Sequence, residues 1–165
     1  MAAIHKFSLI YDAAEDRLAW IVEDLEGATT RLWLTARLCR GLVPAVVRLL
    51  NKTRADIAAE HETAVQSWEQ AAAMTGFGKV PAVRAGALTT TGLVTAAHIR
   101  PSVDGMVLTF DFGAGDNRTI ALSTTAVRQM LAVMHRVHLA AGWPVDVWPA
   151  WIARAAARPP SDVVN

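Results

Sequence analysis

The chain has 165 residues, of which 53% are hydrophobic and 19% are charged, and its formal net charge is +1. This composition excludes an intrinsically disordered chain, and the near-neutral charge gives no whole-chain reason to expect nucleic acid or an anionic membrane as a partner. One cysteine, Cys39, excludes an internal disulfide framework and fits a reducing compartment. Arginines interrupt the apolar stretches and no signal sequence precedes the first predicted strand, so we expect a cytoplasmic protein with no membrane contact.

Residues 6–50 predict three strands followed by a helix. Apolar side chains alternate with polar or small ones in Phe7–Tyr11, Leu18–Val22 and Leu32–Leu34, which is the period of a strand with one buried face. Thr35 stands where the hydroxyl of an N-cap residue would start the helix.

Residues 54–74 predict an amphipathic helix with a narrow apolar seam. The members of the seam recur at steps of four and three residues: Ile57, His61, Ala64, Trp68 and Ala71. Such a seam packs either on its own domain, which is the arrangement we expect, or on a partner helix. The residues that follow, 75–93, are rich in Gly, Thr, Ala and Pro and predict a flexible linker.

Residues 94–138 repeat the pattern of residues 6–50 in the same register and without a gap. The matching positions include Leu18 and Met106, Trp20 and Leu108, Leu34 and Leu122, and Thr35 and Ser123. We therefore predict one α+β domain over residues 1–158, an antiparallel β-sandwich or intertwined sheet built from two similar β-β-β-α halves, with a helical pair inserted between them. The remaining residues, 159–165, predict a disordered tail.

Three tryptophans lie close together after the second half, at Trp143, Trp148 and Trp151. Large aromatic side chains at this density either cover an open edge of the core or anchor a partner surface. Trp68, on the predicted 54–74 helix, is a fourth candidate anchor.

The sequence shows no catalytic set. His135 and His138 are three residues apart on a predicted helix, but no nearby cysteine or carboxylate completes a metal-ligand set. Cys39 has no histidine in register that would activate it as a nucleophile. We therefore expect no enzyme activity, no metal and no cofactor.

Six arginines are the candidate residues of a basic surface. They lie on or beside the two predicted helices and on the predicted third strand: Arg31, Arg37, Arg40, Arg48, Arg128 and Arg136. Together they could bind phosphates or an acidic partner. The alternative is a solvated face that pairs with the glutamates of the 54–74 helix.

The order of elements resembles the head domain of the XLF-type superfamily, which contains DNA-repair and centriole scaffold proteins. The matching stretches are Phe7–Leu34, the helical pair Thr35–Met74, and Val94–Leu139. This resemblance implies a β-sandwich that dimerises and assembles without catalysis. The chain departs from that family because the long coiled coil that follows the head is replaced by the short segment Trp143–Arg158.

The doubled unit also resembles PUR-type repeats, in which two strand-rich halves intertwine and bind single-stranded nucleic acid. The segment Arg31–Thr35 is, in addition, similar to small bacterial proteins without known function. We expect a non-catalytic scaffold or adaptor that forms a homodimer and binds a protein partner. The alternative is a single-stranded nucleic-acid-binding protein that uses the arginines together with Trp20 and Trp33.

Overall fold

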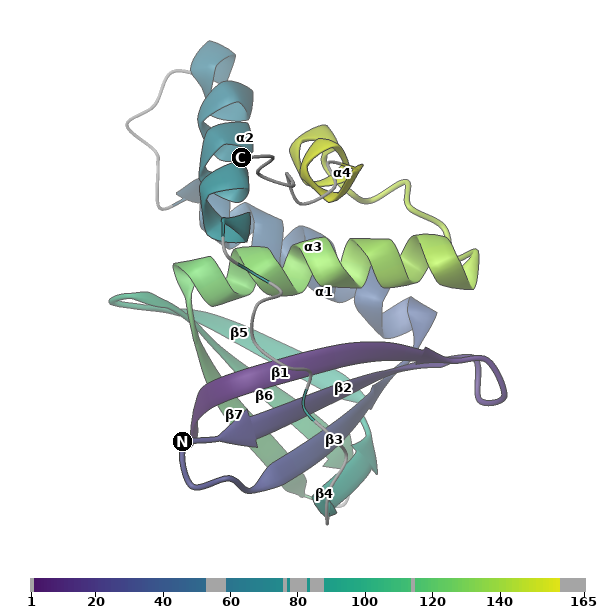
Figure 1. Ribbon diagram of the computed structural model, residues 1–165. Helices are drawn as coiled ribbons and strands as arrows, with labels where there is room; N and C mark the ends of the chain where they lie inside the picture. The colour runs from purple at the N-terminus through teal and green to yellow at the C-terminus, as the bar shows by residue number, and fades with distance from the viewer. Residues whose placement is uncertain are drawn as a thin grey trace, which may run out of the picture.

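Seven strands form two sheets that face each other beneath a group of helices (Figure 1). The computed structural model describes residues 2–52, 59–75, 77, 83, 88–113 and 115–157. In chain order these contain β1 (Ala2–Asp12), β2 (Arg17–Asp24), β3 (Thr29–Leu34), α1 (Ala36–Lys52), α2 (Ala59–Met74), β4 (Leu88–Leu93), β5 (Ala96–Ser102), β6 (Gly105–Gly113), β7 (Asp116–Ser123), α3 (Thr124–Ala141) and α4 (Ala150–Ala157). The predicted α+β class is confirmed.

The first sheet is mixed and the second is antiparallel. The first has the order β4-β3-β2-β1, in which β3 and β4 are parallel, and the second has the order β7-β6-β5. The start of β1 joins them, because Ala2 and Ala3 pair in parallel with Ile120 and Ala121 of β7. None of the described helices is long and apolar enough to cross a bilayer.

The two sheets bury their alternating apolar side chains in one core. Trp20 of β2 meets Phe110 of β6 edge to face, with 5.4 Å between the ring centroids. The same cluster contains buried residues of α1, α3 and α4. The N-terminal and C-terminal thirds of the chain therefore share a hydrophobic interior.

The second strand, the third strand and the helix of the two β-β-β-α units match at a constant spacing along the chain. Positions 88 residues apart, such as Leu18 and Met106, are equivalent in β2 and β6, in β3 and β7, and in α1 and α3. The N-caps match, because Thr35 Oγ1 accepts a hydrogen bond from Leu38 N at 3.2 Å and Ser123 Oγ accepts one from Ala126 N at 3.2 Å.

The first strands of the two units correspond with a different spacing. Leu9 lies opposite Trp20 in the β1–β2 hairpin, whereas Ile99 lies opposite Leu108 in the β5–β6 hairpin. The equivalent residues are therefore 90 apart here, because the second hairpin has a turn that is two residues shorter. The gapless alignment predicted for these strands is wrong.

Strands of each unit pair with strands of the other, and the helix of each unit packs on a strand of the other. The start of β1 pairs with β7 of the other unit, and β4, which leads into β5, pairs with β3. In the same way α1 packs on β5 and α3 packs on β1. Each helix thus covers a strand that belongs to the opposite unit.

The predicted linker is wrong over part of its length. Leu88–Leu93 forms β4, because its threonines favour a strand and β3 offers a free edge. Earlier in the same stretch, Phe77 lies 6.2 Å from the ring of Phe7, and Val83 N donates to Ser8 Oγ at 2.8 Å. Thr75 continues from α2, since its backbone N donates to the carbonyl of Ala72 at 3.1 Å. Residues 76, 78–82 and 84–87 of the linker, the predicted first turn at 54–58 and the tail 159–165 lie outside the described residues.

Candidate binding surfaces

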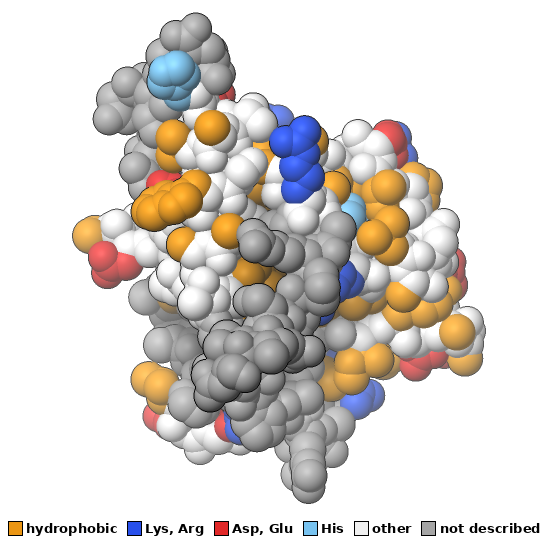
Figure 2. All heavy atoms as spheres, turned by 45° about the horizontal axis from the view of Figure 1, so that its top comes forward, with side chains coloured by type: hydrophobic (Ala, Val, Ile, Leu, Met, Phe, Trp, Pro, Cys, Tyr) orange, Lys and Arg blue, Asp and Glu red, His pale blue; other side chains and the backbone are white. Residues whose placement is uncertain are grey.

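Helix α2 presents its apolar seam to solvent. Trp68 is 72% exposed, and the other described members of the seam are exposed as well: His61, Ala64 and Ala71. In Figure 2, hydrophobic side chains are visible on the outer side of this helix. The expectation that the seam packs on its own domain is therefore wrong. We call His61, Ala64, Trp68, Ala71 and the adjacent exposed Ala72 the α2 outer face.

The polar side of α2 is buried instead, because α3 places an arginine beneath it. The Arg128 side chain is only 3% exposed, and its Nη2 donates to Gln66 Oε1 at 2.6 Å and to Glu69 Oε2 at 2.5 Å. Gln70 Nε2 donates to the backbone carbonyl of Arg128 at 2.9 Å. A buried guanidinium requires acceptors, and the polar side of α2 supplies them.

The three C-terminal tryptophans are buried within the molecule. Trp151 receives the Arg128 guanidinium over its ring at 5.4 Å, which ties α4 to α3. Trp143 donates through Nε1 to Asp16 at 2.9 Å, and this hydrogen bond lowers the pKa of the Asp16 carboxyl. Trp148 is also buried. These side chains cover the core and are not exposed for a partner, which leaves Trp68 as the exposed candidate anchor.

Two buried histidines lie among the tryptophans. The ring of His138 is 5.0 Å from Trp143 and 5.2 Å from Trp148, and the ring of His135 is 5.1 Å from Trp148. Burial lowers the pKa of both imidazoles. Within the described residues, no three His, Cys, Asp or Glu side chains are placed to hold a metal ion together.

The six candidate arginines do not form one surface. Arg128 is buried, Arg40 pairs with Asp146 at 2.6 Å, and Arg31 lies over the Trp33 ring at 5.4 Å. Arg136 is exposed on α3. Arg37 and Arg48 line a common cavity.

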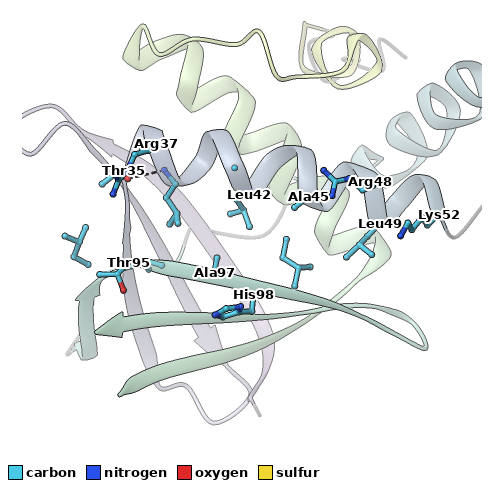
Figure 3. Close-up of a pocket in the computed structure, with 15 residues that line it drawn as sticks. Thr35, Arg37, Leu42, Ala45, Arg48, Leu49, Lys52, Thr95, Ala97 and His98 are labelled. Carbon is cyan, nitrogen blue, oxygen red and sulfur yellow. Dashed lines mark hydrogen bonds between the residues drawn. The ribbon is translucent and has the colours of Figure 1, made fainter. Parts of the chain in front are cut away.

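That cavity is a groove of about 720 Å³ between α1 and β5 (Figure 3). Arg37 lies toward one end of α1, and Arg48 and Lys52 lie toward the other; His98 stands on the strand opposite. Leu38, Leu42, Leu49 and Ile99 contribute apolar surface between them. His98 also contacts Asp111, which does not line the groove; its Nε2 is 3.0 Å from Asp111 Oδ2.

Sequence reasoning missed this groove. It named Arg37 and Arg48 but gave no role to the small residues Gly41 and Ala45, which face the groove from the same side of α1. Their spacing of four residues, next to arginines at the same helical period, was the available signal. The contribution of β5 could not be found, because it depends on the exchange of strands between the units.

Cys39 has no access to solvent. Burial raises the pKa of its thiol to about 12, so the thiolate that a nucleophile requires is not formed near neutral pH.

No family model, curated protein or solved structure matches this chain.

Proposed function

We propose that this protein is a non-catalytic scaffold or adaptor that self-associates through the α2 outer face. One observation carries the proposal: α2 buries its glutamines and leaves Trp68 and the alanines around it in solvent. An exposed tryptophan surrounded by small side chains is a frequent feature of protein–protein contacts.

A second copy of the chain is the partner that this face fits best. In a two-fold symmetric dimer, the same face of each copy forms the contact. If one residue of the first copy contacts a second residue of its partner, the symmetry repeats that contact with the two copies interchanged. Two α2 helices that cross in opposite directions near Trp68 bring Ala64 of one copy close to Ala71 and Ala72 of the other. These small residues leave room for each indole ring and allow the helices to approach closely.

The resemblances inferred from the order of elements agree with such a role. A sandwich of two intertwined halves, as in XLF-type heads or PUR-type repeats, remains our interpretation of the two facing sheets. Nucleic-acid binding has less support, because Arg128 is buried and Arg40 is paired, so fewer of the six arginines are available to phosphates.

The test is the mass of the protein in solution, measured by light scattering after gel filtration at several micromolar concentrations. We expect the wild type to form a dimer and Trp68→Glu to be a monomer with unchanged circular dichroism. Leu25→Glu is the matched control, because Leu25 is also 72% exposed but lies in the turn between β2 and β3. A monomeric wild type would remove the proposal, and a dimeric Trp68→Glu would exclude this face as the contact.

A further inference from the structure

The groove between α1 and β5 has a counterpart in the other unit, between α3 and β1. Both consist of a helix packed on the first strand of the opposite unit. Their side chains differ in size, since Gly41 and Ala45 of α1 correspond to Gln129 and Val133 of α3, and Ala97 of β5 corresponds to Phe7 of β1.

The larger side chains of the counterpart have partners inside the molecule. Gln129 Nε2 donates to the carbonyl of Ala73 at 2.8 Å, and Phe7 packs against Trp20 and Phe77 with 6.2 Å between ring centroids in each pair. Larger side chains therefore occupy the equivalent positions of the counterpart. The α1/β5 groove is open because three small residues stand where the other unit has large ones.

The open groove also carries more positive charge than its counterpart. Arg37, Arg48 and Lys52 line it, whereas the equivalent positions on α3 are Thr125, Arg136 and Ala140. No acidic side chain is among the lining residues; Asp111, which pairs with the lining residue His98, lies outside them. This charge favours an anionic occupant.

The position of the charges indicates the shape of the occupant. Arg48 follows Arg37 by 11 residues and Lys52 follows it by 15, so the two basic ends are about 16 to 22 Å apart at 1.5 Å per helical residue. An extended chain covers this distance in about five to seven residues at roughly 3.3 Å each. The lining between the ends is apolar, and β5 is the last strand in the sheet order, with no strand beyond it among those described.

We propose that the α1/β5 groove binds an extended segment of a partner protein that carries a carboxylate at each end and small apolar side chains between them. One carboxylate pairs with Arg37 and the other with Arg48 or Lys52. The apolar side chains occupy the space over Gly41, Ala45 and Ala97, and the segment lies along the free edge of β5.

Gly41 permits a clean test. A Cβ atom added at Gly41 would have no atom within 4 Å, and glycine weakens a helix interior, so a larger residue there is compatible with folding. The variant Gly41→Gln/Ala45→Val copies the closed counterpart into the open groove.

The probe is the peptide Glu-Thr-Val-Thr-Val-Thr-Glu, which in an extended conformation places both glutamates and both valines on one side. It is titrated into isotope-labelled full-length protein, and the amide signals of α1 and β5 are followed by NMR. We expect saturable shifts there with the wild type and loss of at least tenfold in affinity with Gly41→Gln/Ala45→Val. We expect Arg48→Gln to weaken binding by about two- to fivefold, as for an exposed ion pair. The matched control Arg136→Gln removes the equivalent charge of the closed half and should leave the affinity unchanged.

Several results would overturn the proposal. These are the absence of saturable shifts at millimolar peptide, equal binding of a peptide with glutamine at both ends, and shifts confined to α2. Saturation by a fatty acid but not by the peptide would assign the groove to a small amphiphile instead. Because none of these substitutions lies on α2, each variant should keep the mass in solution of the wild type, and a failure of the α2 outer face is distinguishable from a failure of the groove.

Discussion

Arg40 and Arg128 occupy equivalent positions on α1 and α3, but the molecule uses them in opposite ways. Arg40 is 56% exposed and pairs with Asp146 at the surface, whereas Arg128 is buried beneath α2 and α4. The same contrast holds for the neighbouring helix–strand contacts, because small and basic residues line the α1/β5 groove whereas larger residues occupy the equivalent positions between α3 and β1. The two units share one backbone plan but differ in what it supports: α3 of the second unit packs against α2 and α4, and α1 of the first unit keeps an accessible surface. We call this difference the division of tasks.

The largest expected difference between the two halves concerns these arginines. Arg128→Ala removes a buried guanidinium that pairs with Glu69 and should lower the free energy of unfolding by about 3–5 kcal/mol. Arg40→Ala at the equivalent position should cost at most about 1 kcal/mol, because its ion pair is exposed. Urea denaturation of both variants measures the difference. Equal losses would contradict the division of tasks.

The histidine pair should make the second half sensitive to pH. Burial lowers the pKa of His135 and His138, so the folded state binds fewer protons than the unfolded state as the pH falls through about 6.5. The free energy of unfolding should therefore be highest above that pH and decrease toward pH 5. We expect this decrease to be smaller than the effect of Arg128→Ala. Denaturation at a series of pH values measures this.

The first half supplies the control for that experiment. The positions equivalent to His135 and His138 in α1 are Val47 and Leu50, so His135→Val/His138→Leu copies the first half into the second. The double variant should lose the decrease in stability between pH 7 and pH 5. An unchanged pH profile would show that other groups are responsible.

The helix caps should behave alike in the two halves. Thr35 and Ser123 each accept a hydrogen bond from the backbone amide three residues later, at 3.2 Å in both cases. Thr35→Ala and Ser123→Ala should each cost about 1 kcal/mol in thermal or urea denaturation. If only one of the two substitutions destabilised the protein, the same cap geometry would not give the same stabilisation in the two halves.

The smallest expected effect has the opposite sign. Gly41→Ala removes a flexible residue from the interior of α1 and meets no neighbouring atom, so it should raise stability by about 0.5–1 kcal/mol. Calorimetry measures the increase in melting temperature. A decrease would indicate that the backbone at Gly41 needs a conformation that alanine disfavours.

The sequence was sufficient for those features that depend on neighbouring residues. The alternation in Leu18–Val22 identified a strand, and the hydroxyls of Thr35 and Ser123 placed the starts of two helices. It failed for Leu88–Leu93, where abundant glycine and threonine near prolines favoured a linker although the threonines could equally form a strand. That choice depended on the edge of β3, which is far away in the chain.

The local periods of the chain determined which segments become strands and helices and which of their side chains enter the common core, because these follow from backbone geometry and the burial of apolar surface. Only the tertiary structure decided which side of α2 faces water. The apolar seam would have turned inward if hydrophobicity alone had acted, but Arg128, contributed by a helix much later in the chain, required the acceptors of Gln66 and Glu69. The open groove has the same origin, since Gly41 and Ala97 line one groove only because α1 packs on the first strand of the opposite unit.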